Sequence, residues 1–190
     1  PLMSLPLLFS TDLKTIPNFP YIYPEEKLVN DWNNKLKENK GFKVGLFWQG
    51  NTESSGSKKR AIKLKDLETL LELKKIDFIS LQKGDGHEQI KKTRFSKYML
   101  DNNNIIDSRG DAFIDTAAII KNLDLVISSD TSIVHLSGAI GTKVWMLEPK
   151  IPNWTWTNYG TTTSWYSSLE IFRQEKADDW KKPVKDLKNK

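Results

Sequence analysis

Four side chains able to bind phosphate or sugar hydroxyls follow a short apolar run in the second half of the chain. They are Asp130, Thr131, Ser132 and His135, and the run before them is residues 125–127. Apolar residues then recur at helical spacing, so the four side chains stand at the start of a helix. The free N–H groups and the positive dipole end of a helix N-terminus favour phosphate. The cluster therefore predicts a phosphate or sugar site.

The elements that must position this cluster are read from the same segment. Residues 125–127 are predicted to form a buried strand and residues 131–140 a helix, with Asp130 as N-cap and Gly141 at the C-terminal end. In open α/β sheets, ligands bind just past the carboxyl ends of strands, which is where the cluster lies. An alternative stays open at this point, because Asp and Thr are common helix caps and a lone His is more often structural than functional.

Two further loops follow predicted strands and carry polar or basic side chains. The candidates are Asn51, Lys58, Lys59 and Arg60 after the first strand, and Lys83 and Glu88 after the second. Basic side chains in these loops can reach a diphosphate, and Glu88 is placed to accept hydrogen bonds from a ribose. Neither the P-loop pattern nor the Gly-x-Gly-x-x-Gly fingerprint is present. A solvated loop is the alternative for any one of these residues.

A long loop over residues 148–166 is rich in aromatic side chains. It contains Trp154, Trp156, Trp165 and Tyr166. Such rings can stack on a nucleobase or a sugar. A loop of this length also needs apolar anchors of its own, and we favour the interpretation that the rings pack the loop onto its domain.

Strands and helices are predicted to alternate along the chain, which indicates an α/β fold with a doubly wound, parallel six-stranded sheet of Rossmann type. The predicted strands are residues 42–48, 76–81, 105–106, 125–127, 143–147 and 169–172. The predicted helices are residues 25–37, 64–73, 87–95, 113–123, 131–140 and 178–187. For the helix at 113–123, Asp111 is the expected N-cap and Phe113 is expected on the buried face.

Two regions are expected from the distribution of proline and of the predicted strands. Residues 41–190 should form the Rossmann-like domain, and residues 1–40 an extended, Pro-rich lead-in with one helix that packs on it. Apolar side chains in the lead-in suggest that it packs onto a surface; they are Leu7, Leu8, Phe9, Tyr21 and Tyr23. The chain opens with Pro1 and has no initiator Met, so it is either processed or a piece of a longer protein. We favour a piece, because the expected fold leaves one half of an active site missing.

The composition excludes several classes of function. The chain has 190 residues, a net charge of +5, no Cys and two His, so thiolate metal sites are excluded and a His-based zinc site is not expected. No zinc-finger spacing or basic helix accompanies the charge, so we expect no nucleic-acid partner. No apolar run approaches the roughly 18 residues of a membrane span. No signal peptide opens the chain, and together with the absence of Cys this points to the cytoplasm.

Several segments together resemble the glycosyltransferase family that includes the bacterial heptosyltransferases. More closely, the chain is similar to the glycosyltransferase-like domain attached to tetratricopeptide repeats in many bacterial proteins. The matching segments are residues 3–6, 44–51, 80–84, 115–118, 124–131, 135–139, 165–166 and 172–174. They run through nearly the whole chain in the expected order.

The resemblance implies a GT-B architecture, in which two Rossmann-like domains face each other across a cleft. This chain would be the carboxyl-terminal, donor-binding domain of an inverting glycosyltransferase that uses a nucleotide-diphosphate sugar, without metal or other cofactor. The general base would come from an N-terminal domain that is not in this chain, so no catalytic residue is assigned. The expected partners are the nucleotide-sugar donor and, in the longer protein, that N-terminal domain or tetratricopeptide repeats.

The resemblance also implies roles for the candidate residues. Asp130 would contact the sugar, Thr131 and Ser132 the diphosphate, and His135 would support them from one helical turn further on. One of Lys58, Lys59 or Arg60 would neutralise the departing diphosphate, although Arg60 precedes Ala61 where related loops often have Ser. Glu88 would lie near the ribose.

Three alternatives remain open on the sequence alone. The first is a nucleotide-sugar-binding module that has lost catalysis, and the second is a protein-interaction module. The third is a GT-B nucleotide-sugar 2-epimerase, which needs additional acid–base groups. The candidates for those groups are Asp85, His87, His135 and Glu148.

Overall fold

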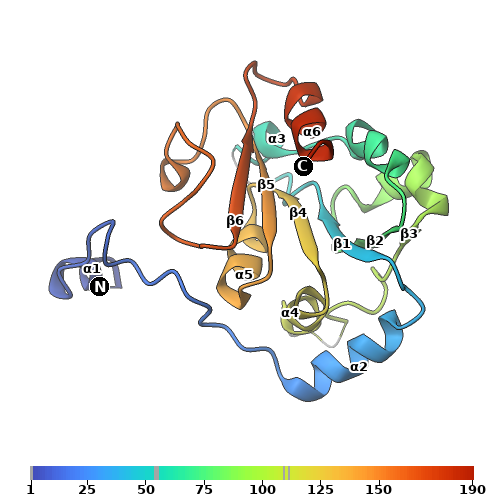
Figure 1. Ribbon diagram of the computed structural model, residues 1–190, viewed down its shortest axis with the longest axis horizontal. Helices are drawn as coiled ribbons and strands as arrows, with labels where there is room; N and C mark the ends of the chain where they lie inside the picture. Colours follow the sequence, from blue (N-terminus) through green and yellow to red (C-terminus); the bar gives the residue numbers. More distant parts are fainter. Residues whose placement is uncertain (1, 54–55, 109, 111) are drawn as a thin grey trace.

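A single parallel sheet forms the centre of the computed structural model, which describes residues 2–53, 56–108, 110 and 112–190. Its six strands follow the order β3-β2-β1-β4-β5-β6 (Figure 1). They are β1 (Phe42–Phe47), β2 (Ile76–Ser80), β3 (Met99–Leu100), β4 (Leu125–Ser129), β5 (Val144–Glu148) and β6 (Leu169–Arg173). All five neighbouring pairs are parallel. The predicted doubly wound, six-stranded Rossmann-like sheet is confirmed.

Helices cover both faces of this sheet. The α-helices are α1 (Leu5–Leu8), α2 (Glu26–Leu36), α3 (Ser57–Arg60), α4 (Ile114–Lys121), α5 (Ser132–Ile140) and α6 (Lys181–Lys188). The 3-10 helices are η1 (Leu2–Ser4), η2 (Leu64–Glu72), η3 (His87–Lys92), η4 (Arg94–Lys97) and η5 (Trp154–Trp156). Helices α4 and α5 lie on one face, with α2 packed outside α4, while α6 and η2 contact each other on the opposite face (Figure 1).

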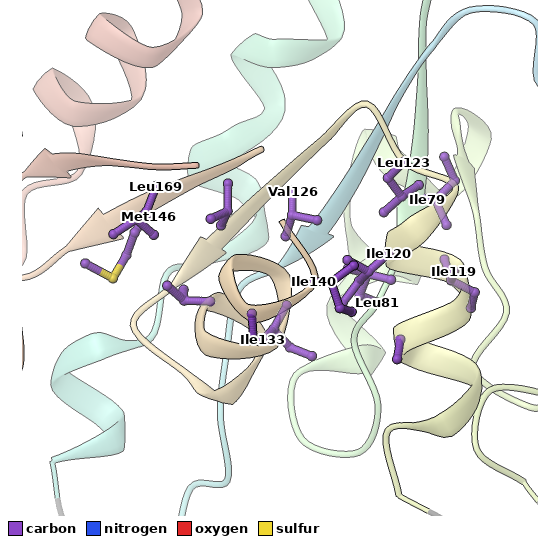
Figure 2. Packing of buried hydrophobic residues seen from close by; sticks show 14 of the residues in the cluster. Ile79, Leu81, Ile119, Ile120, Leu123, Val126, Ile133, Ile140, Met146 and Leu169 are labelled. Carbon is purple, nitrogen blue, oxygen red and sulfur yellow. The ribbon is translucent and has the colours of Figure 1, made fainter. Parts of the chain in front are cut away.

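Alternation of side chains along the strands divides the core into two clusters, one on each face. In β5, Val144 and Met146 belong to the cluster beneath α4 and α5, whereas Trp145 and Leu147 belong to the cluster beneath η2 and α6. Figure 2 shows the first cluster, in which strand residues such as Val126 meet helix residues of α4 and α5. Both faces are therefore buried, as a parallel sheet requires.

The third strand is not where the sequence predicted it. Residues 105–106 form a turn, in which the amides of Ile105 and Ile106 both donate to the carbonyl of Asn102 at 2.9 and 3.0 Å. The strand is β3 instead, and it pairs with Phe78 and Ile79 of β2. The apolar pair misled the prediction because Ile106 is anchored in the core, at 1% exposure, without pairing to any strand.

Two of the predicted helices are 3-10 helices in the structure. Residues 64–73 correspond to η2, and residues 87–95 are divided into η3 and η4. The division lies at Thr93, whose φ of −127° and ψ of 167° are extended and interrupt the helical hydrogen bonding. The apolar spacing identified helical segments but not their hydrogen-bond type.

The start of α4 also differs from the prediction. Phe113 is 43% exposed and lies at the N-cap with φ 70°, so its expected place on the buried face is wrong. The expected cap, Asp111, lies outside the described residues. Asp107 provides a cap from the preceding loop, because its Oδ1 accepts from the amides of Asp115 and Thr116 at 2.7 and 3.2 Å.

The lead-in before α2 contacts the domain through residues 18–22. Figure 1 shows η1 and α1 projecting away from the sheet, and Leu7 and Phe9 are 83% and 76% exposed, so their predicted packing onto a surface is not found within this chain. The amides of Tyr21 and Ile22, by contrast, donate to the carbonyl of Ala139 at the end of α5 at 2.9 and 3.1 Å.

Within the described part of the chain, no helix combines the length and apolarity that crossing a bilayer requires.

Candidate functional site

A cavity of about 730 Å³ opens at the carboxyl edge of the sheet, at the ends of β1 and β4. The loop after β1, the start of α5, the segment before α4 and residues 153–156 supply its walls. The order of the strands reverses between β1 and β4, because β1 continues toward β2 on one side and β4 toward β5 on the other. This topological switch point is where open α/β sheets bind their ligands.

Seven of the ten predicted site residues line this cavity. They are Asn51, Arg60, Lys83, Asp130, Thr131, Ser132 and His135. The other three do not: Lys58 and Lys59 are exposed on α3, and Glu88 is exposed on η3. Helix α3 has a single turn, and of its three basic side chains only Arg60 lines the cavity.

Asp130 is buried and serves as an anchor. Its side chain is 4% exposed, Oδ1 accepts from Nε1 of Trp156 at 2.8 Å, and Oδ2 accepts from Nη1 of Arg60 at 3.4 Å. The prediction that Asp130 is the N-cap of α5 is wrong, because Thr131 holds that position with φ −148° and ψ 176°. The carboxylate instead orients Trp156 and Arg60 at the wall of the cavity.

The N-terminus of α5 is open toward the cavity. Thr131 makes no capping hydrogen bond, and its hydroxyl contacts Oγ of Ser128 at 3.1 Å instead. Within the described chain, the amides of Ser132 and Ile133 have no hydrogen-bond partner. Two N–H donors, the positive end of the helix dipole and the Arg60 guanidinium therefore meet at one place, which suits an anion. The predicted end of the helix at Gly141 is confirmed, at φ 84°.

His135 lies on the same helix, one turn further on. Its ring stacks on Trp156 with centroids 4.9 Å apart and an interplanar angle of 26°. Nδ1 lies 3.1 Å from Oη of Tyr166. Burial lowers the pKa of His135, and the nearby Asp130 carboxylate only partly opposes this shift. The imidazole is therefore neutral at neutral pH.

The aromatic loop packs onto the domain, as the favoured interpretation had it. Trp156 and Tyr166 are 1% and 7% exposed and belong to the core cluster beneath α5, and Nε1 of Trp165 donates to the carbonyl of Thr155 at 3.0 Å. Trp154 is 81% exposed. Trp156 still reaches the cavity wall, so a packing residue also shapes the site.

Lys83 and Asn51 line the cavity but also have partners within the fold. The ammonium of Lys83 donates to the carbonyls of Ile106 and Asp107 at 2.9 and 2.7 Å, which ties down the loop before α4. Oδ1 of Asn51 accepts from the amide of Glu53 at 2.8 Å. Lys83 retains one donor for a ligand, since an ammonium has three.

The sequence analysis missed the contact between Glu148 and Arg173. Glu148 has no exposed side-chain surface, and its Oε2 accepts from Nη1 of Arg173 at 2.6 Å. Burial raises the pKa of Glu148 to about 8; Arg173 opposes the shift and Asp130 adds to it. The two residues are register partners in the β5–β6 pair, a signal that only a known strand register makes visible.

The epimerase alternative required several acid–base groups around one ligand. Of its four candidates, His135 lines the cavity, whereas Asp85, His87 and Glu148 do not. Asp85 accepts from Thr52, and His87 lies 2.8 Å from Asp101. The site therefore does not gather the groups that this alternative needs.

Gly138 explains how Tyr166 reaches α5. A Cβ atom at Gly138 would overlap the Tyr166 ring. Gly138→Ala in an ordinary helix would stabilise the fold by about 0.5–1 kcal/mol. Here we expect destabilisation by about 1–3 kcal/mol, because the ring must move. Urea unfolding measures the change, and a stabilised variant would contradict the packing of Tyr166 on α5.

No protein-family model matches the chain. Protein FlbA of Caulobacter vibrioides is 30% identical over 166 residues, which is 84% of this chain and 27% of FlbA. Among solved structures, glycosyl transferase family 9 from Veillonella parvula matches 91% of this chain and 47% of its own, with TM-score 0.59 and 10% identity. ADP-heptose lps heptosyltransferase II of E. coli matches 83% of this chain and 47% of its own, with TM-score 0.55 and 10% identity.

E. coli heptosyltransferase WaaC, solved with ADP-2-deoxy-2-fluoro heptose, has TM-score 0.51 at 13% identity, over 80% of this chain and 43% of its own. The chain thus has the fold of a heptosyltransferase-like GT-B glycosyltransferase domain. It spans about a quarter of FlbA and less than half of each solved structure.

Proposed function

We propose that this chain is the carboxyl-terminal, donor-binding half of an inverting glycosyltransferase, and that its cavity binds the diphosphate of a nucleotide sugar. One observation carries the proposal: Arg60 and the uncapped start of α5 line the same cavity at the β1/β4 switch point. The solved neighbours support it, since E. coli WaaC is described with ADP and with an ADP-sugar.

In the proposed reaction, negative charge builds on the departing diphosphate, next to Arg60 and the N-terminus of α5. An acceptor oxygen forms a bond to the anomeric carbon while the bond from that carbon to the diphosphate oxygen breaks, and the electron pair leaves with the diphosphate. Arg60 and the amides of Ser132 and Ile133 stabilise this growing charge. We assign the neutralising role to these groups and not to a metal ion. Asp130 contributes by orienting Arg60.

The remaining parts of the enzyme are assigned to the rest of a longer protein. The chain spans less than half of the solved neighbours, so we place the acceptor site and the general base on an N-terminal domain, with tetratricopeptide repeats as a further attached part. Sugar transfer by the protein joined to that domain distinguishes an enzyme from a binding module without catalysis.

Calorimetric titration of the chain with ADP, UDP and GDP tests the proposed site. We expect Arg60→Ala to weaken binding of the preferred diphosphate by about 10- to 100-fold, the effect of losing one or two charged hydrogen bonds. Lys58→Ala and Lys59→Ala are matched controls, because they remove the same charge from the same turn but do not line the cavity.

The controls should change the dissociation constant by less than about threefold, as expected for exposed charges. Equal losses in all three variants would show that the general positive charge attracts the nucleotide and would contradict a built site. Binding of none of the three diphosphates to the wild-type chain would overturn the proposal.

A further inference from the structure

Three polar side chains connect the lead-in to the cavity. Oη of Tyr21 lies 3.3 Å from Oη of Tyr166, which in turn lies 3.1 Å from Nδ1 of His135. His135 lines the cavity, whereas Tyr166 does not. Because Nδ1 faces Tyr166, Nε2 is the polar atom that His135 offers to the cavity. Nε2 has no hydrogen-bond partner in the part of the chain that the structure describes.

Packing holds each member of this connection in place. The ring of His135 stacks on Trp156, and the absence of a side chain at Gly138 lets Tyr166 lie against α5. Tyr21 is fixed by its own amide, which donates to the carbonyl of Ala139 at 2.9 Å. The hydroxyl of Ser167, next to Tyr166, donates to the carbonyl of Asn18 at 3.2 Å. The lead-in is therefore held against the segment that carries Tyr166.

The hydrogen bonds of Tyr166 determine where the imidazole proton lies. A neutral imidazole has one N–H and one acceptor nitrogen, and the partner of one nitrogen sets the state of the other. The hydroxyl of Tyr166 has a single hydrogen and two possible partners. A phenol is a stronger acid than a neutral imidazole N–H, and the imidazole nitrogen is the better acceptor. The hydroxyl therefore donates to Nδ1 of His135, and Tyr21 donates to Tyr166.

We propose that Tyr21 and Tyr166 are positioning residues that hold His135 as the neutral Nε2–H tautomer, so that Nε2–H donates a hydrogen bond to a phosphate oxygen of the bound nucleotide. The other tautomer would turn a lone pair toward the anion. The choice of phosphate as the acceptor rests on the proposed function, whereas the tautomer depends only on this chain.

Nitrogen-15 NMR of the imidazole rings tests the tautomer without any ligand. At a pH above the titration of His135, Nε2 should show a pyrrole-like shift and Nδ1 a pyridine-like shift. Tyr166→Phe should move the Nδ1 signal, whereas Tyr159→Phe, which alters a tyrosine that is 76% exposed, should not. A pyrrole-like Nδ1 in the wild type would overturn the proposal. His87, which pairs with Asp101, serves as the internal reference.

Binding of ADP, or of whichever diphosphate binds best, tests the role of Nε2–H. His135→Gln places an amide N–H near the position of Nε2, whereas His135→Asn places one near Nδ1. We expect Gln to retain binding within about threefold and Asn to lose about tenfold, the effect of one hydrogen bond to a charged group. Equal losses would overturn the role of Nε2–H.

Tyr166→Phe and Tyr21→Phe should weaken diphosphate binding by about two- to tenfold, because each removes one neutral hydrogen bond from the connection.

Failure of the positioning role of the tyrosines can be distinguished from failure of the proposed diphosphate-binding function. A pyrrole-like Nδ1 with tight diphosphate binding overturns only the positioning role. The Nε2–H tautomer without any diphosphate binding overturns the proposed function, and with it the phosphate contact of His135, but leaves the positioning by Tyr166 supported.

Discussion

Replacing Trp156 with Ala is expected to lower the free energy of unfolding by about 3–5 kcal/mol, the usual cost of removing a buried indole. Trp156 is 1% exposed and contacts His135 and Tyr166 in the core cluster beneath α5. The loss also leaves Oδ1 of Asp130 without its donor. A buried carboxylate whose remaining contact is a 3.4 Å ion pair to Arg60 adds to the destabilisation.

Trp154→Ala is the matched control, two residues away in the same 3-10 helix. Its side chain is 81% exposed, so we expect a change of less than about 0.5 kcal/mol. Trp156→Phe separates the hydrogen bond from the packing, and we expect about 1–3 kcal/mol for the lost donor. Denaturant unfolding measures all three variants. Equal stability of the Trp154 and Trp156 variants would contradict the anchoring role of Trp156.

The second large effect concerns pH. Burial raises the pKa of Glu148 to about 8, above its ordinary value of 4.5. Between these values the native state holds a proton that the unfolded state has released, so stability is fully present below pH 4.5 and is lost as pH rises toward 8. From pH 5 to pH 8 this group should remove on the order of 3 kcal/mol from the free energy of unfolding.

Glu148→Gln removes this titration while keeping the shape of the side chain. The difference in unfolding free energy between the Gln variant and the wild type should therefore grow in favour of the variant from pH 5 to pH 8. Glu38→Gln, which removes a carboxylate at an exposed position, is the matched control. If the Glu148 variant instead loses stability relative to the wild type as pH rises, the carboxylate is ionised in the fold, and Arg173 dominates its environment.

Much of the architecture could be predicted because it depends on local patterns. Apolar runs mark the strands and apolar faces mark the helices, so their alternation along the chain indicates the parallel sheet. The end of α5 at Gly141 follows from a positive φ that glycine adopts readily. The third strand was misplaced because β3 has two residues, both half-buried, and its apolar content is no higher than that of the turn at 105–106. Only pairing with β2 distinguishes them.

The sequence predicts where the candidate site lies, but not which side-chain contacts form it. The carboxyl ends of the first and fourth strands meet at one edge in any sheet of this order, which brings Asn51 and Asp130 to the same cavity. The choice of Arg60 over Lys58 and Lys59 depends on the direction of one short turn, which spacing does not reveal. The bond between Asp130 and Trp156 joins residues 26 positions apart and comes from tertiary packing alone.

The pairing of β1 with β4 has a kinetic consequence. Val44 lies beside Leu125, and Leu46 beside Ile127, so the two strands whose ends meet at the cavity come from segments 81 residues apart in the chain. Closing so long a loop is entropically unfavourable, and contacts of this separation slow folding. During synthesis, β1 emerges long before the strand that completes the cavity. The walls of the cavity are therefore complete only after α5 and residues 153–156 have left the ribosome.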